Sequence, residues 1–299
     1  MTIIKIVNNV PYHYETIESV ISYYNKIFKI DKSDKDVIYL DIRNNNEYLT
    51  YITNKYPKII INKNIDTYDF YINCTIYPND FDKIKNMNPK KYYYICHQVD
   101  AKMIYMPNVF YLTPLCKTNR YINCDILPYQ SNKNINKNIP IYVIQGNITE
   151  GRRNYKLLHN ILSFKTNYKY KIKIVGRGNL DKSFDKYKNK LIIKNNLNFI
   201  DYHKEFLDCY CIIPLITKKS HSQYYTTKLT STVNYANAYN LRVLTDKDLQ
   251  SIYKFKNAVV FDNENDIHIG FKKTLDKFYK HIKTNPNINI NQNQISNTT

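Results

Sequence analysis

The sequence lacks several features that would place it in a specialised class of protein. It has no tryptophan, only 5 glycines in 299 residues and no CxxC pair. No apolar run approaches the roughly 20 residues that a membrane-spanning helix needs. Residues 1–15 also lack the basic segment followed by an apolar stretch that marks a signal peptide. These absences predict a soluble, cytoplasmic protein without a transmembrane segment.

The cysteine pattern does not indicate a metal site. No histidine accompanies the cysteines at zinc-ligand spacing, so we expect no bound metal and reduced, mostly buried thiols. The six cysteines are Cys74, Cys96, Cys116, Cys124, Cys209 and Cys211.

Acidic residues are few compared with basic ones, 25 Asp and Glu against 44 Lys and Arg, for a net charge of +19. Such a charge attracts nucleic acid, anionic membrane surfaces or phosphorylated ligands. The lysines are scattered, however, and the bias toward Lys, Ile, Asn and Tyr suggests an AT-rich genome, such as that of a giant DNA virus. We therefore expect no specific nucleic-acid site. Peripheral contact with an anionic surface stays open, and a viral protein would act in the host cytoplasm.

The chain is long enough for two domains with separate cores. In its first part, short β-branched or aromatic runs alternate with helix-like stretches at 15–29 and 45–56. This alternation predicts a parallel sheet covered by helices. The predicted strands are residues 3–7, 37–40, 59–61, 70–72, 92–96 and 109–112.

A second α/β unit follows a polar, Asn-rich stretch at 128–139, which is typical of a linker. Helices are predicted near 152–165, 180–189, 228–239 and 266–282. Strands are predicted at 141–144, 171–175, 191–193 or 198–200, 209–214, 242–245 and 258–261.

We therefore predict an α/β protein with two Rossmann-like domains facing a cleft. Residues 1–137 would form the first domain, residues 138–283 the second domain and residues 284–299 a disordered tail. Ligands of such sheets bind beyond the carboxyl ends of the strands.

Two glycine-bearing loops follow predicted strands of the second domain. Gly146 ends the first of these strands, and Arg152 and Arg153 precede the next helix. Guanidinium groups match phosphate oxygens and a helix N-terminus adds donors, although an exposed basic turn has the same pattern. The strand at 171–175 runs into Gly176-Arg177-Gly178, where glycine would let the backbone approach a ligand or would simply form a tight turn.

A Thr/Ser-rich segment then enters the helix predicted near 228–239. Hydroxyls and free amides at the positive end of a helix can bind an anion, and Lys228 adds a point charge. Capping of the helix by Thr227 or Thr230 is the alternative interpretation.

In this order the segment from about 140 to 265 resembles the donor domain of GT-B-fold glycosyltransferases of group 1. The resemblance also rests on Pro214 in a strand and on the closing strand 240–244. It implies metal-independent transfer of a sugar from a UDP- or GDP-linked donor to a glycan or other hydroxyl acceptor, without a cofactor. It also implies that residues 1–137 are the acceptor-side domain and residues 138–283 the nucleotide-sugar-binding domain. Arg153 and Lys228 would bind the diphosphate, and Thr230, Ser231 and Thr232 would line its oxygens.

Two positions depart from the pattern of that family. Many retaining members carry two glutamates about seven residues apart on this helix, where the chain has Thr227 and Tyr235. The stereochemical outcome therefore stays open, as do three alternatives: a non-catalytic binding protein, a sugar-nucleotide epimerase and, less favoured, a basic nucleic-acid-binding protein.

The first domain offers one candidate catalytic residue. His97 directly follows the strand at 92–96, where an imidazole could act as a base or hydrogen-bond the donor sugar, although a structural histidine is the alternative. Asn8, Asn9, His13 and Asp41 lie in loops after strands. Loop tyrosines could stack on an acceptor sugar; they are Tyr12, Tyr14, Tyr224 and Tyr225.

Overall fold

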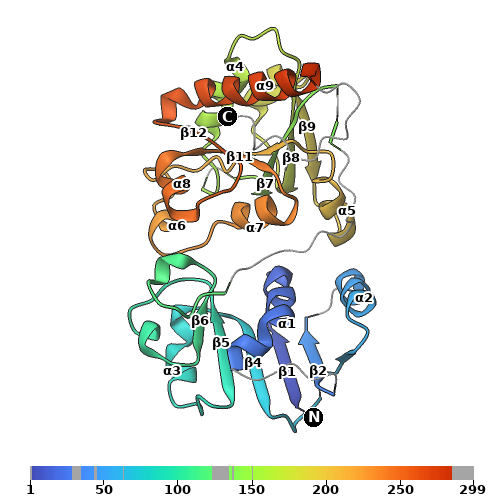
Figure 1. Cartoon of the computed structure of the whole chain (residues 1–299), viewed down its shortest axis with the longest axis vertical. Helices are drawn as coiled ribbons and strands as arrows, with labels where there is room; N and C mark the ends of the chain where they lie inside the picture. Colours follow the sequence, from blue (N-terminus) through green and yellow to red (C-terminus); the bar gives the residue numbers. More distant parts are fainter. Residues whose placement is uncertain are drawn as a thin grey trace. The chain divides into compact units, whose positions relative to one another are not determined.

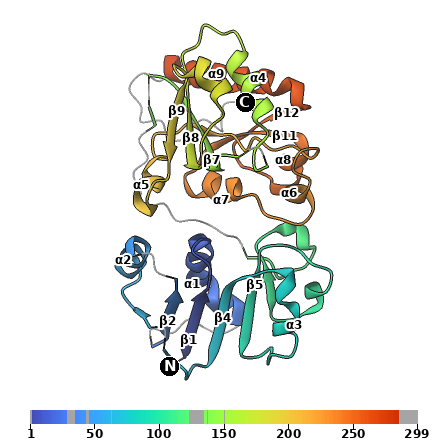
Figure 2. The same ribbon diagram turned by 180° about the vertical axis from the view of Figure 1, so that it is seen from behind.

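The computed structural model of the protein describes residues 2–28, 35–43, 46–62, 64–122, 135–136, 138–149 and 151–284. By its internal contacts the chain divides into two compact units (Figures 1 and 2). The first unit comprises Met1–Leu127 and Thr226–Leu229, and the second comprises Pro128–Tyr225 and Thr230–Thr299. The predicted domain boundary at residue 137, most of the predicted linker, Cys124 and the predicted tail from residue 285 onward lie outside the described residues.

The first unit is built on a six-stranded parallel sheet with the order β3-β2-β1-β4-β5-β6. Every strand predicted in this half is present. The strands are β1 (Ile3–Asn8), β2 (Val37–Ile42), β3 (Ile59–Ile61), β4 (Phe70–Ile76), β5 (Tyr92–Cys96) and β6 (Val109–Tyr111). The helices are α1 (Tyr14–Phe28), α2 (Asn46–Lys55) and α3 (Phe81–Ile84).

The second unit repeats this architecture with the strand order β12-β11-β10-β7-β8-β9, again all parallel. Its strands are β7 (Ile141–Asn147), β8 (Lys171–Arg177), β9 (Leu191–Asn195), β10 (Cys211–Ile212), β11 (Arg242–Asp246) and β12 (Ala258–Phe261). Its helices are α4 (Tyr155–Ser163), α5 (Phe199–Lys204), α6 (Gln223–Thr226), α7 (Ser231–Ala238), α8 (Lys247–Tyr253) and α9 (Ile267–Thr284). The predicted α/β fold with two Rossmann-like sheets is confirmed.

Several predicted elements of the second half differ in the structure. The strand alternative at 198–200 is wrong, because the Asn198 side chain accepts a hydrogen bond from Asp201 N and caps α5. The segment near 180–189 is a 3-10 helix, Lys182–Tyr187, rather than an α-helix. The helix expected near 228–239 begins only at Ser231. Helix α8 was not predicted.

Tyrosines are among the largest fully buried side chains of the described residues. Tyr142 and Tyr210 are fully buried between the second sheet and α9. Each hydroxyl finds a partner there: Tyr142 Oη lies 2.7 Å from Thr274 Oγ1, and Tyr210 Oη donates to the Thr274 carbonyl at 3.3 Å. A buried hydroxyl without a partner would be destabilising, so Thr274 makes these two large side chains compatible with the core. The five described cysteines are buried and form no disulfide.

Candidate functional site

The glycines at the ends of β7 and β8 are required by the packing of the second unit itself. Gly146 and Gly176 lie side by side in the ladder, and a Cβ on Gly176 would stand 1.6 Å from the Gly146 carbonyl oxygen. Gly178 has φ +104, and its Cβ would meet the Ile148 carbonyl oxygen at 3.0 Å. Glycine is therefore needed here whether or not a ligand binds. The approach of a ligand to this backbone stays a prediction.

Arg153 is buried, with 6% of its surface exposed, unlike the other predicted donor-binding arginines of the second unit. Its guanidinium donates to the carbonyl oxygen of Gln145 and, at 2.7 Å, to that of Arg152. A Cβ on Gly146, which has φ +109, would stand 2.5 Å from Arg153 Nη2. The missing side chain at position 146 thus leaves the space that the guanidinium occupies at the end of β7.

The charge of Arg153 is not neutralised by an ion pair within the described residues. Burial lowers the pKa of Arg153, because removing the guanidinium from water disfavours its charged form. Two carbonyl oxygens supply hydrogen bonds but no formal negative charge. A buried cation in this state is costly to the free protein, and an anion would remove that cost. The position is therefore suited to a phosphate group.

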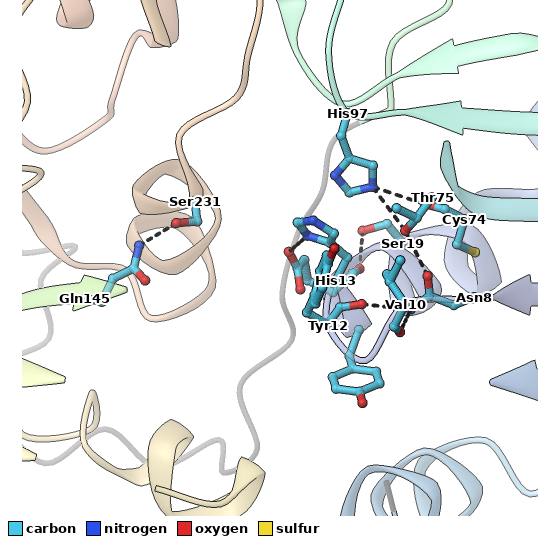
Figure 3. A network of polar contacts seen from close by, with 12 residues as sticks. Asn8, Val10, Tyr12, His13, Ser19, Cys74, Thr75, His97, Gln145 and Ser231 are labelled. Atoms are coloured by element: carbon cyan, nitrogen blue, oxygen red, sulfur yellow. Dashed lines mark hydrogen bonds and ion pairs between the residues drawn. The ribbon is translucent and has the colours of Figure 1, made fainter. Parts of the chain in front are cut away.

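Gln145 links the end of β7 to the start of α7. Its amide nitrogen donates to Ser231 Oγ at 2.7 Å (Figure 3), and its amide oxygen accepts from Tyr202 Oη at 3.1 Å. Because Ser231 Oγ accepts this bond, its own proton is left to donate elsewhere. Gln145 thereby connects two predicted donor-binding residues, Arg153 through its backbone and Ser231 through its side chain.

The start of α7 carries the three predicted hydroxyl residues. Thr230 occupies the N-cap position, but its side chain makes no capping hydrogen bond. Thr230 and Thr232 are buried, and Ser231 is half-buried. The first N–H groups of a helix have no partner within that helix. The beginning of α7 therefore combines hydroxyl and amide donors beside the end of β7.

Other predicted donor-binding residues are not part of this group. Arg152 and Arg177 are exposed. Lys228 belongs to the first unit, where it forms an isolated antiparallel bridge with Gln98. The neighbouring Val99 N donates to the Thr227 carbonyl at 2.9 Å. Because residues 227 and 228 are paired in this way, the helix begins only after them, at Ser231. Contact of Lys228 with a diphosphate stays a prediction.

Two residues beside Arg153 were missed by the sequence analysis. Gln145 is 4% exposed and His221 is 3% exposed. Burial lowers the pKa of His221, and the nearby charge of Arg153 lowers it further. A signal for Gln145 was present, since it is a polar residue that closes an apolar strand directly before glycine. No signal marked His221, because the loop that carries it has no periodicity.

His97 lies in the first unit after β5 and is held as a neutral imidazole. Its Nε2 is 3.2 Å from the Cys74 carbonyl oxygen, which can only accept, so Nε2 carries the proton. Loss of water around the ring lowers the pKa of His97 to about 3, and the charge of His13 acts in the same direction. His97 is therefore uncharged at neutral pH, with Nδ1 as its acceptor.

His13 lies next to His97 (Figure 3) and forms a pair with Glu15. The two imidazole rings have centroids 4.0 Å apart, and His13 Nδ1 lies 3.2 Å from Glu15 Oε1. Burial opposes ionisation of Glu15, but the hydrogen bond and charge of His13 outweigh it and lower the Glu15 pKa. The carboxylate accepts from Nδ1, which leaves Nε2 of His13 able to take a proton. His13 also has φ 65, an unusual conformation for a residue other than glycine.

Asn8 holds the loop that carries His13. It is fully buried, and its amide nitrogen donates to the carbonyl oxygens of Val10 at 3.2 Å and Tyr12 at 2.8 Å. Its amide oxygen accepts from Thr75 Oγ1 at 2.8 Å, and the same hydroxyl lies 3.4 Å from His97 Nε2. The two histidines are therefore fixed by one hydrogen-bond network, shown in Figure 3.

The remaining polar and aromatic candidates have separate roles. Asp41 forms an ion pair with Lys5, with Oδ2 3.9 Å from Nζ, and Asn9 is exposed. Tyr14 stacks on Tyr48 with ring centroids 4.4 Å apart. Tyr225 is buried and donates to Asp246 at 2.5 Å, so it is unsuited to an acceptor platform.

No protein-family model matches the chain, and no curated protein matches its sequence. Solved structures share its fold. AviGT4, a glycosyltransferase involved in avilamycin A biosynthesis, aligns over 92% of this chain and 88% of its own, with 9% identity and a TM-score of 0.56. Sucrose-phosphate synthase from Thermosynechococcus elongatus aligns over 99% of this chain and 96% of its own, with 8% identity and a TM-score of 0.55. At these identities the similarity establishes the two-domain fold alone.

The described residues contain no group of three or more His, Cys, Asp or Glu side chains that could hold a metal ion. None of their helices has the length and hydropathy required to cross a membrane.

Proposed function

We propose that the protein is a glycosyltransferase that moves a sugar from a nucleotide diphosphate donor, UDP- or GDP-linked, to a glycan or other hydroxyl acceptor. The observation that carries the proposal is the buried, unneutralised guanidinium of Arg153 at the end of β7, joined through Gln145 to the hydroxyl at the start of α7. The shared fold with solved glycosyltransferases is consistent with it.

In this proposal the second unit binds the diphosphate. Arg153 supplies a full charge, Ser231 donates its hydroxyl proton, and the first amides of α7 supply further donors. Together they would stabilise the charge that develops on the leaving diphosphate, so no metal ion is required. Contact of Lys228 with the diphosphate remains a proposal.

The first unit provides the acid–base chemistry. His97 was the predicted catalytic residue, but with a pKa of about 3 it is a weak base at neutral pH. We assign the base to the neutral form of His13, in which Nδ1 donates to Glu15 and Nε2 accepts a proton from the acceptor hydroxyl; Glu15 then stabilises the imidazolium that forms. His97 keeps the role of a neutral hydrogen-bonding group toward the sugar.

Binding is tested by thermal shift with a panel of UDP- and GDP-sugars at millimolar concentration. A donor at 100 times its dissociation constant stabilises the protein by about 2.7 kcal/mol. Replacing Ser231 by Ala should weaken donor binding at least about ten-fold, since a hydrogen bond to a charged group contributes about 1.5–3 kcal/mol. Ser163→Ala, at an exposed serine that ends α4, is the matched control and should leave binding unchanged.

Product analysis separates transfer from the alternatives. Sugar release that depends on an acceptor supports the proposal. Conversion of the donor sugar without any acceptor would identify an epimerase instead. Donor binding without release across a broad acceptor panel would identify a binding protein, and absence of stabilisation by every nucleotide sugar would contradict the proposal entirely.

A further inference from the structure

A second group of basic residues lies at the amino ends of the strands of the second sheet, whereas Arg153 lies at their carboxyl ends. Arg242 is the first residue of β11, so it stands at the amino end of the strand, whereas Arg153 contacts the carboxyl end of β7. Helix α9 packs against β11 and β12 (Figure 1). Its last turns carry Lys277 and His281 on either side of Phe278 in the sequence.

The contacts of one tyrosine place Arg242 beside the part of α9 that carries Lys277 and His281. The guanidinium of Arg242 lies 5.5 Å from the centroid of the Tyr210 ring, and the same ring lies 5.0 Å from that of Phe278. Residues 274, 277, 278 and 281 share one face of the helix because they are three or four positions apart. The charge of Arg242, added to the effect of burial, lowers the pKa of both Lys277 and His281.

Polar atoms of this group are left without partners. Arg242 is 4% exposed, and its Nε has no hydrogen-bond acceptor; Nε2 of His281 is also buried without one. Within the described residues, no carboxylate forms an ion pair with Arg242, Lys277 or His281. The nearby Asp276 is bonded to Lys272 at 2.9 Å.

The environment offers only a small compensating charge. The C-terminal end of a helix is equivalent to about half a negative charge, less than the charge of Arg242 alone. A buried guanidinium with an unsatisfied N–H is costly. An anion bound between β11 and α9 would accept from Arg242 Nε, would accept from His281 Nε2 when that nitrogen carries a proton, and would offset the charge.

We propose that Arg242, Lys277 and His281 form a second anion site, distinct from the donor site, that binds a phosphate group. A groove of about 410 Å³ shares Lys277 with it and is otherwise lined by Lys273, Asp276 and residues 258–260 of β12. Its size suits the organic part of a small phosphate monoester. Because β11 begins at this anion site and belongs to the same sheet as β7, we expect a bound anion to stabilise the sheet that also carries the donor site.

Hydrogen exchange read by mass spectrometry tests the site in the full chain. The probes are inorganic phosphate and glucose 6-phosphate, with sodium chloride at equal ionic strength as the reference. At twice its dissociation constant, either probe should slow exchange in peptides covering 240–246 and 277–284 about three-fold. Greater slowing by the sugar phosphate would assign the groove to its organic part, and equal slowing would assign the site to the phosphate alone.

The double variant Lys277→Gln/His281→Gln should abolish this slowing, and Lys280→Gln, at an exposed lysine on the same helix, should retain it. These variants avoid the buried Arg242 and are therefore expected to fold. Exchange in residues 145–154 reports the donor site separately in the same spectra. No slowing at 240–246 and 277–284, or slowing that the double variant preserves, would overturn the inference.

Discussion

Replacing Arg153 by methionine tests whether this arginine binds the donor or only stabilises the fold. Methionine fills a similar volume but has no charge and no donor. The change removes two hydrogen bonds to carbonyl oxygens, which together contribute about 3–6 kcal/mol as bonds from a charged group. It also removes the desolvation cost of a buried ion, which amounts to several kcal/mol. The free energy of unfolding should therefore change by less than about 2 kcal/mol.

Donor binding should respond very differently to the same change. A charged contact with phosphate that is removed from a buried position costs about 2–5 kcal/mol. Because 1.4 kcal/mol corresponds to a factor of ten, a loss of about 3 kcal/mol weakens the donor about 100-fold. Isothermal titration with UDP- or GDP-sugars measures this affinity, and urea unfolding of the free protein measures stability.

The control is Arg152→Met, at the exposed neighbour of Arg153. An exposed charge contributes about 1 kcal/mol or less, so this variant should bind the donor with an affinity within ten-fold of the original. The opposite outcome is that Arg153→Met destabilises the free protein by more than about 4 kcal/mol while the folded fraction keeps its donor affinity. Arg153 would then be a structural residue.

Three further predictions concern the glycine pair and the histidines. Gly176→Ala should cost more than about 3 kcal/mol in urea unfolding, because the new Cβ would meet a backbone oxygen at 1.6 Å, whereas Gly151→Ala, with no atom within 4 Å, should be close to neutral. Because His97 has its pKa lowered from 6.5 to about 3, the folded state binds fewer protons than the unfolded state in that range, so stability should fall as pH drops from 6.5 toward 3. A His97→Gln variant that shows the same fall would contradict this origin. His13→Gln should lower kcat by about 10²–10⁴, and Glu15→Gln by less, with little change in donor affinity; an unchanged kcat in His13→Gln would remove it as the base.

The elements of both sheets could be predicted from local patterns. Runs such as 171–175 and 258–261 are β-branched and apolar, and strands buried on both faces require such residues. The alternation of these runs with helical periodicity then specifies a parallel sheet with crossover helices. Short or polar elements could not be predicted from such patterns. The 3-10 helix Lys182–Tyr187 and α5 depend instead on hydrogen bonds that the Asp181 and Asn198 side chains accept from backbone N–H groups.

The candidate site could be predicted only in part. The end of β7 and the start of α7 were found because glycine, arginine and hydroxyl residues follow strands or precede helices. Their connection through Gln145 joins residues 86 positions apart, and no local pattern reports such a bond. The same holds for His13 and His97, whose rings meet because β1 and β5 both flank β4.

The sequence by itself determined the α/β class, the two sheets and which loops follow their strands, because these depend on periodicity and turn chemistry within short segments. Tertiary structure alone decided the charge states and groupings. Arg153 is a buried cation without an ion-pair partner in the described residues, and Lys228 belongs to the first unit. Neutral His97 and the His13–Glu15 pair likewise arise from desolvation and from contacts between distant segments. Such effects depend on what surrounds a side chain in space, which its neighbours in the chain do not specify.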